Sequence, residues 1–122
     1  MVIGIGVDII EIDRIRAALE NPKTGERFRQ RVYTAEEIDY CRRRRRSFES
    51  FAARFAAKEA TIKALGQFAA WHDIEVVRKD GPPALHLHGR ARIRASELGI
   101  QRVFLSLSHS QNLAIAYVVV ES

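Results

Sequence analysis

Apolar residues occur in short runs along the chain, and their spacing distinguishes strands from helices. Residues 2–10 are rich in Val and Ile and open with two glycines, which predicts a buried strand. Four further apolar runs predict strands over residues 73–78, 84–88, 103–108 and 113–120. Turn-forming residues separate the two members of each successive pair. These four strands are therefore expected to form two hairpins.

Helical spacing, with apolar residues three or four positions apart, fills most of the remaining chain. It predicts one helix directly after the first strand and short helices over residues 27–32 and 90–98. Thr34 and Glu37 have the spacing of a capping box. This box predicts a helix that begins there and runs to about Arg46.

The clearest helix spans residues 47–66. Phe51, Phe55 and Ile62 fall on one stripe, six alanines add helix propensity, and Gly66 follows as the helix-ending residue. Along the chain, the order is one strand, several helices, a hairpin, a helix and a second hairpin. This order predicts an α+β fold, in which helices pack on a small, mainly antiparallel sheet.

Composition and charge narrow the class of protein. The 122 residues fit one domain, and 20 Lys and Arg against 15 Asp and Glu give a net charge of +5. This excess indicates an anionic partner, which could be a nucleic acid, a phosphate ligand, an acidic protein or a membrane surface. Cys41 is the only cysteine, which excludes an intramolecular disulfide and favours a reducing compartment. Residues 1–8 do not have the pattern of a signal peptide, so we expect a cytoplasmic protein.

Two carboxylates stand beside apolar segments. Glu59 lies at the edge of the apolar stripe of its helix, where it either pairs with Lys63 or takes part in chemistry. Asp8 lies where the first strand approaches a helix, where it either caps that helix or presents a ligand group at the end of the strand. Two such carboxylates, with basic residues nearby, suit Mg²⁺ and a phosphate ligand.

Two further features carry charge. If the last strands alternate, Val103, Leu105, Leu107 and His109 share one face, and His109 is either a structural residue or a site residue. Arg42–Arg46 is either a solvated helical face or a nucleic-acid patch. The run lacks interleaved aromatic residues, which argues against binding of single-stranded nucleic acid.

Three blocks of sequence occur in a fixed order: residues 4–15, residues 51–66 and residues 105–110. Together they resemble the holo-acyl-carrier-protein synthase family, the small single-domain class of 4′-phosphopantetheinyl transferases. The match extends over essentially the whole chain, residues 1–122, as one transferase domain. The chain departs from the pattern at residues 67–71, where many members have a glycine loop on the nucleotide side.

The resemblance implies a reaction and a set of site residues. Members transfer the 4′-phosphopantetheine arm of coenzyme A to a serine of apo acyl carrier protein, release adenosine 3′,5′-bisphosphate, and use Mg²⁺. By this resemblance, Asp8 and Glu59 hold the metal and, with Lys63, are catalytic. The residues that match coenzyme A contacts are Arg54, Lys63, His109 and Ser110.

The resemblance also implies partners. An acidic carrier would dock on the positions that match family contacts, which are Arg14, Arg27, Phe28 and Arg31. Family members are homotrimers with active sites between subunits, and they serve fatty acid biosynthesis and lipid metabolism. No nucleic acid or membrane partner is expected on this reading. Two alternatives remain: a small basic nucleic-acid-binding module that uses Arg42–Arg46, and a non-catalytic trimer with a degenerate site.

Overall fold

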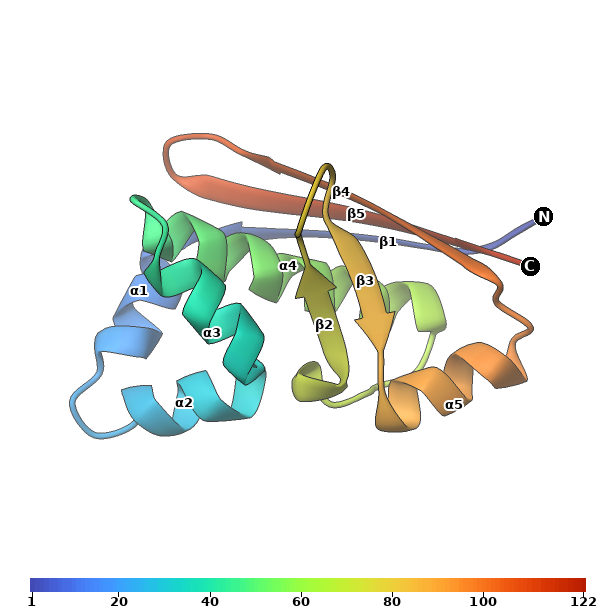
Figure 1. Cartoon of the computed structure of the whole chain (residues 1–122), viewed down its shortest axis with the longest axis horizontal. Coiled ribbons are helices and arrows are strands. Elements are labelled where there is room, and N and C mark those ends of the chain that lie inside the picture. The colour runs from blue at the N-terminus through green and yellow to red at the C-terminus, as the bar shows by residue number, and fades with distance from the viewer.

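A computed structural model describes all residues, 1–122, as one long helix packed against a three-stranded sheet (Figure 1). The antiparallel sheet has the order β1 (Val2–Glu11), β5 (Leu113–Glu121) and β4 (Arg102–His109), and β2 (Ile74–Val77) pairs separately with β3 (Ala84–Leu87). The helices are α1 (Ile12–Glu20), α2 (Gly25–Val32), α3 (Ala35–Arg42), α4 (Ser47–Leu65) and α5 (Gly89–Glu97), with a short 3₁₀ turn, η1 (Trp71–Asp73). The predicted α+β fold is confirmed.

The long helix α4 runs along one face of the sheet, with α1, α2 and α3 gathered at one end and α5 at the other (Figure 1). Residues of β1, β5 and β4 alternate between this covered face and the opposite, open face. On the covered face, the core alanines of α4 meet four buried residues of β5: Ala114, Ala116, Val118 and Val120. None of the helices is long and apolar enough to cross a membrane.

Strand β1 approaches α4 closely because two of its inward-facing residues have no side chain. A Cβ atom on Gly6 would overlap the carbonyl oxygen of Ala60, and one on Gly4 would overlap the carbonyl oxygen of Ala64. Only glycine permits this backbone-to-backbone approach. Asp8 and Ile10 follow on the same face of β1, so the two glycines also determine how close Asp8 comes to α4.

The predicted elements are confirmed to within two residues, apart from the helix that was expected to run to Arg46. The capping box of Thr34 and Glu37 is present, but α3 ends at Arg42, and residues 43–46 form a turn. The chain turns here to enter α4, and the backbone N–H of Arg44 donates to the carbonyl oxygen of Cys41 at 3.1 Å, a three-residue bond that closes the last turn of α3. The Arg44 guanidinium lies over the ring of Tyr40, 5.3 Å from its centroid.

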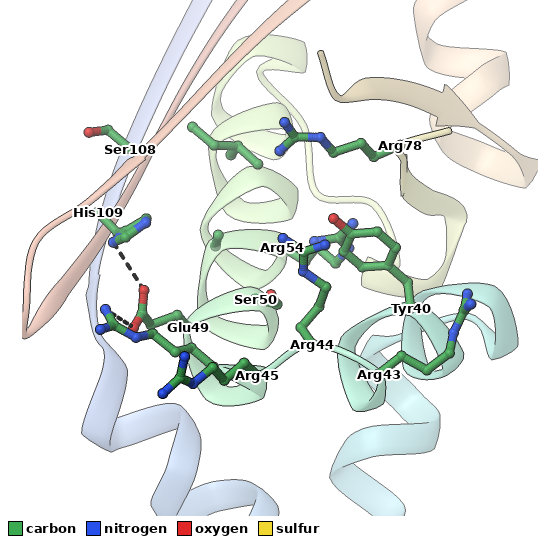
Figure 2. A pocket seen from close by; sticks show the side chains of 13 residues that line it. Tyr40, Arg43, Arg44, Arg45, Glu49, Ser50, Arg54, Arg78, Ser108 and His109 are labelled. Carbon is green, nitrogen blue, oxygen red and sulfur yellow. Dashed lines mark hydrogen bonds and ion pairs between the residues drawn. The ribbon is translucent and has the colours of Figure 1, made fainter. Parts of the chain in front are cut away.

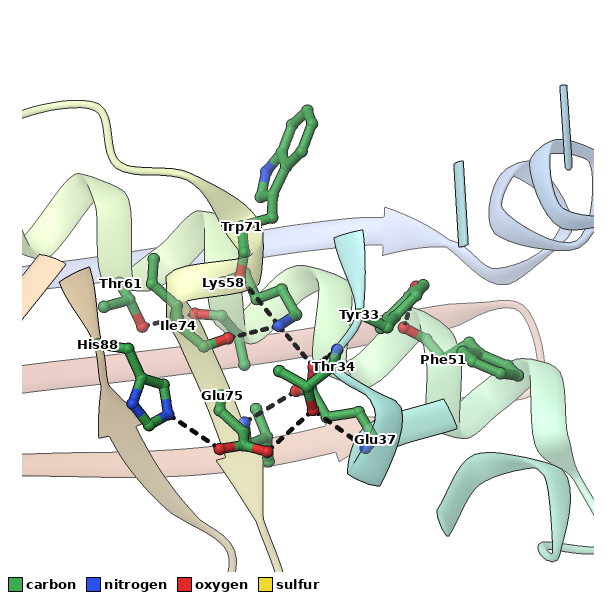
Figure 3. A network of polar contacts seen from close by, with 12 residues as sticks. Tyr33, Thr34, Glu37, Phe51, Lys58, Thr61, Trp71, Ile74, Glu75 and His88 are labelled. Atoms are coloured by element: carbon green, nitrogen blue, oxygen red, sulfur yellow. Dashed lines mark hydrogen bonds and ion pairs between the residues drawn. The ribbon is translucent and has the colours of Figure 1, made fainter. Parts of the chain in front are cut away.

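A buried polar network ties α3, α4 and β2 together (Figure 3). The fully buried Lys58 ammonium donates to Glu37 Oε1 at 2.7 Å, and Glu37 Oε2 accepts from the backbone N–H of Val76 at 2.8 Å. Burial lowers the pKa of Lys58, while the Glu37 carboxylate acts in the opposite direction. Thr34 then connects Glu37 to Glu75 through its backbone N–H and its hydroxyl.

Replacing Lys58 by Met would leave the buried Glu37 carboxylate without its counter-charge. We expect Lys58→Met to lower the free energy of unfolding by about 3–5 kcal/mol, the usual loss when one partner of a buried ion pair is removed. Urea unfolding followed by circular dichroism measures this change. Lys63→Met is the matched control on the same helix, because the side chain of Lys63 is half-exposed and its pair with Asp8 contributes little stability. Equal losses in the two variants would contradict this account.

Candidate functional site

A first cluster of charged residues joins β1 to α4. Lys63 Nζ donates to Asp8 Oδ1 at 3.2 Å and to the carbonyl oxygen of Val7 at 2.9 Å. Asp8 lies on the covered face of β1 opposite Ala116, and its side chain is 17% exposed. Asp8 therefore does not cap α1, whose N-cap is Glu11. Its carboxylate is presented from within β1, three residues before the end of the strand, toward α4. The reading of Asp8 as a helix cap is therefore wrong, and its reading as a ligand group stays a prediction.

We group Glu59 with these residues because it lies one helical turn before Lys63 on α4, but its partner differs from the one that the helical spacing suggests. A pair between Glu59 and Lys63 is not formed, because the Lys63 ammonium reaches across to Asp8. The indole N–H of Trp71 instead donates to Glu59 Oε2 at 2.8 Å. The two carboxylates are thus held by different partners, one by an ammonium group and one by a neutral N–H donor.

The donor set of this cluster fits Mg²⁺. This ion is commonly bound by one or two carboxylates, while phosphate oxygens and water complete its octahedral coordination. Asp8 and Glu59 supply two hard oxygen donors, and the Lys63 ammonium already lies at the Asp8 carboxylate, where positive charge is favoured. The chain groups no third acidic, histidine or cysteine ligand with them. The cluster therefore suits an ion that takes two ligands from the protein and its remaining ligands from a bound phosphate and water.

A second cluster lines a pocket of about 650 Å³ at the start of α4 (Figure 2). Its basic residues come from the turn after α3, from α4, from the residue after β2 and from the end of β4; they are Arg43, Arg44, Arg45, Arg46, Arg54, Arg78 and His109. Arg42 does not line this pocket. Most of the arginine run is therefore one wall of a concave, strongly basic site.

Arg54 is the most unusual residue of this pocket. It is only 4% exposed, it forms no salt bridge, and its Nε has no hydrogen-bond partner. Its guanidinium lies over the ring of Tyr40, 4.1 Å from the centroid. A buried charge without an ionic partner is costly. An anion in the pocket would supply the missing partner, and guanidinium groups match the geometry of phosphate oxygens.

His109 extends from the end of β4 toward Glu49 of α4 (Figure 2). The register of β4 with β5 puts it on the covered face with Val103, Leu105 and Leu107, which confirms the predicted alternation. Its Nδ1 lies 3.0 Å from Glu49 Oε1, and Arg46 contacts the other oxygen of Glu49 at 3.4 Å. Ser110 lies in an adjoining hollow with Arg46, Glu49 and His109.

The two clusters are separate within one chain. Asp8 is on β1 and His109 is on β4, the two edge strands, and β5 lies between them. Two inter-strand spacings amount to about 10 Å. None of Asp8, Glu59 and Lys63 lines the pocket that contains Arg54 and His109. The structure thus groups the predicted site residues into an acidic cluster on one side of α4 and a basic pocket on the other.

The residues expected to dock the carrier lie on α1 and α2. Arg14, Arg27 and Arg31 are exposed, and together they present positive charge on this end of the molecule. Phe28 is only partly exposed, because its ring packs on Phe55 with the centroids 6.2 Å apart. The charged positions are therefore free to meet a partner, while Phe28 mainly anchors α2 to α4.

Three residues of these clusters were not singled out from the sequence. Arg78, the residue after β2, lines the basic pocket. The ring of Tyr40 packs against the Arg54 guanidinium, and the indole N–H of Trp71 donates a hydrogen bond to Glu59. The Tyr40–Arg54 and Trp71–Glu59 contacts join residues at least twelve positions apart, and Arg78 is distant along the chain from the other pocket residues, so no helical or strand periodicity relates them. The only signal was that Trp71 is the sole tryptophan of the chain.

Comparison with known proteins identifies the family. The model of the 4′-phosphopantetheinyl transferase superfamily matches residues 4–118. The chain belongs to this superfamily. A holo-acyl-carrier-protein synthase of Solibacter usitatus is 42% identical over 127 residues, which cover all of both chains. The family resemblance and the classification as a transferase, both inferred from the sequence, are confirmed.

Solved structures agree with this assignment. The holo-acyl-carrier-protein synthase of Neisseria meningitidis superposes with a TM-score of 0.87 and 34% identity, and the match covers all of both chains. The synthase of Bacillus anthracis, solved in complex with CoA (3′,5′-ADP), has a TM-score of 0.79 and 37% identity over all of this chain and 98% of that chain. The family therefore includes a protein of the same fold that binds this nucleotide.

Replacing Arg54 by Met tests whether its charge is kept for an anion. Met fills much of the same space and removes a buried charge without an ionic partner, so we expect the Tm of Arg54→Met to equal or exceed that of the wild type. Inorganic pyrophosphate at a hundredfold excess over its Kd stabilises a binding protein by about 2.7 kcal/mol. We expect this stabilisation in the wild type and its loss in Arg54→Met.

Thermal unfolding with and without pyrophosphate measures both effects. Arg92→Met on α5 removes an equal but exposed charge outside the pocket and serves as the control. A variant that is strongly destabilised and still responds to pyrophosphate would show that Arg54 is a structural residue.

Proposed function

We propose that this protein transfers the 4′-phosphopantetheine arm of coenzyme A to a serine hydroxyl of apo acyl carrier protein. The relatives named above are holo-acyl-carrier-protein synthases, and one was solved with this nucleotide. The observation that carries the proposal is the pairing of a basic pocket around the unpaired Arg54 with a carboxylate cluster at Asp8 and Glu59. The first suits the nucleotide phosphates and the second suits Mg²⁺ at the pyrophosphate.

In the proposed reaction, the serine oxygen forms a bond to the phosphorus next to the pantetheine arm. The anhydride bond of the pyrophosphate breaks, adenosine 3′,5′-bisphosphate leaves with the electron pair, and the serine proton passes to solvent water. Asp8 and Glu59 would hold Mg²⁺, which when bound would offset the charge that develops on the leaving phosphate. Lys63, already at Asp8, would add positive charge to the same phosphates.

The basic pocket would bind the nucleotide end of coenzyme A. Arg54 would meet a phosphate with a guanidinium that the fold leaves without an ionic partner. Arg46 and His109 line the same pocket, and Ser110 adjoins it. Glu49 pairs with both Arg46 and His109 in the free protein. An incoming phosphate would compete with this carboxylate for Arg46 and His109.

We further propose that the active site is completed between subunits of a homotrimer. The open face of the sheet exposes large apolar side chains of all three strands: Ile3, Ile5, Val7, Ile9, Phe104 and Tyr117. An apolar face of this extent is typical of a protein–protein contact. Such a contact would bring the acidic cluster of one chain to the basic pocket of its neighbour, and so join the two clusters that α4 separates.

The carrier protein would dock by charge. Acyl carrier proteins are acidic, and Arg14, Arg27 and Arg31 face outward from α1 and α2. Exposed charges of this kind accelerate encounter and set the orientation of the partner.

We place the reaction in the cytoplasm and in fatty acid biosynthesis. The one cysteine, Cys41, is consistent with a reducing compartment. Burial raises the pKa of its thiol to about 12, which keeps it protonated.

The direct test is to incubate the protein with coenzyme A, Mg²⁺ and an apo carrier protein and to measure the mass of the carrier. We expect a gain of one phosphopantetheine arm, dependent on Mg²⁺. Asp8→Asn and Glu59→Gln should each lower the rate by at least about 100-fold, because each removes a charged ligand of the proposed ion. Their Tm should change little, because the Asp8–Lys63 pair is partly exposed. Full activity of both variants would refute the metal assignment.

Mixing two inactive variants tests whether the site is shared between subunits. Asp8→Asn carries an intact basic pocket and Arg54→Met carries an intact acidic cluster. If the two clusters meet across an interface, randomly mixed trimers should regain intact sites at about a quarter of their interfaces. The carrier assay after subunit exchange measures this recovery. If both clusters of one site come from one chain, mixing should restore no activity.

A further inference from the structure

The Glu59 carboxylate has a neighbour that neither the metal chemistry nor the transfer step requires. The indole N–H of Trp71 donates to its Oε2 at 2.8 Å, and no group of the chain donates to its Oε1. An indole can only donate, and its single N–H has one direction. This contact therefore selects one orientation of the carboxylate and leaves one oxygen for another ligand.

Trp71 can hold the carboxylate in that orientation because both its backbone and its indole ring are held by other residues. Its carbonyl oxygen accepts a hydrogen bond from the buried Lys58 ammonium at 3.0 Å. Figure 3 shows the indole pointing away from this buried network while the carbonyl faces into it. The ring packs against Phe55 with the centroids 5.8 Å apart, and the Arg31 guanidinium lies 5.9 Å from its centroid. Backbone and ring are thus both anchored to packed elements.

Lys58 and Glu59 are neighbours on α4, and Trp71 contacts both. Lys58 fixes the backbone of η1, and η1 returns a hydrogen bond to the next residue of the helix. A carboxylate on a helix surface otherwise samples several rotamers, and ordering it costs conformational entropy. A donor that is already fixed by packing reduces that cost before any ion binds.

We propose that Trp71 is a positioning residue that orients the Glu59 carboxylate and leaves its Oε1 free for the metal ion. The proposal rests on the function proposed above, because it assigns a supporting role to a residue beside the Mg²⁺ ligand. Residues that hydrogen-bond to metal ligands commonly change metal affinity by 10- to 100-fold when they are removed. A purely structural role for Trp71, as a ring that packs on Phe55, would affect stability alone.

The variant Trp71→Phe separates these two roles, because it keeps an aromatic ring and removes the N–H. We expect Mg²⁺ to bind the protein–coenzyme A complex about 10-fold more weakly in Trp71→Phe, measured by calorimetry. The Mg²⁺ concentration for half-maximal transfer should rise equally, and saturating Mg²⁺ should recover most of the rate. Phe68→Leu is the control. The rings of Phe68 and Trp71 pack with their centroids 6.3 Å apart, so this substitution changes the surroundings of the indole and leaves its N–H in place.

The wild-type chain offers an independent measurement, because Trp71 is its only tryptophan. Adding Mg²⁺ to the coenzyme A complex should shift the indole fluorescence as Glu59 takes up the ion, and Glu59→Gln should abolish the shift. This measurement tests the coupling between the Trp71 indole and the Mg²⁺ site even where Trp71→Phe fails to fold.

Two outcomes would overturn the proposal. One is a Trp71→Phe protein of lower Tm with unchanged Mg²⁺ affinity. The other is Mg²⁺ binding to the wild type, seen by calorimetry, with no change of fluorescence. Failure of the wild type to modify the carrier would instead refute the proposed function, so the two failures are distinguishable.

Discussion

The close approach of β1 to α4 is the constraint on which the acidic cluster of the site depends. Gly4 and Gly6 let the strand backbone lie directly against the helix at Ala64 and Ala60. Asp8 follows two residues later on the same face, within reach of the Lys63 ammonium. A bulkier residue at either glycine would push the strand from the helix and separate Asp8 from Lys63. A packing requirement and a chemical requirement are therefore met by the same pair of residues.

Helix α4 then distributes its polar residues to different surroundings according to their angle about its axis. Arg54 faces the basic pocket, Lys58 enters the core, Glu59 meets Trp71, and Lys63 reaches β1. Successive residues are about 100° apart, so the neighbouring Lys58 and Glu59 point in different directions. The helix α4 therefore carries a buried ion pair at Lys58 and a more accessible carboxylate at Glu59 in different directions. The Lys58 ammonium pairs with Glu37 and not with Glu59.

The elements were predictable from the sequence where local spacing decides the structure. The strand at residues 2–10, the capping box at Thr34 and the end of α4 at Gly66 all follow from neighbours a few positions apart. The partners of Glu59 and Lys63 did not, because each depends on a contact with a distant element. The proposed metal-binding roles of Asp8 and Glu59 came from the chemistry of two carboxylates near basic residues and from family resemblance. The helical spacing alone favoured a pair of Glu59 with Lys63, which is not formed.

The isolated chain keeps two features that are unfavourable for a lone monomer. Arg54 is a buried charge without an ionic partner, and the open face of the sheet exposes large apolar side chains from all three strands. Burying an unpaired charge and exposing an apolar surface both reduce stability. A phosphate in the pocket would offset the first, and a neighbouring subunit on the sheet would offset the second. In the homotrimer proposed above, the same neighbour would also bring an acidic cluster to a basic pocket. The unfavourable features of the single chain thus mark where its ligand and its partner subunits would bind.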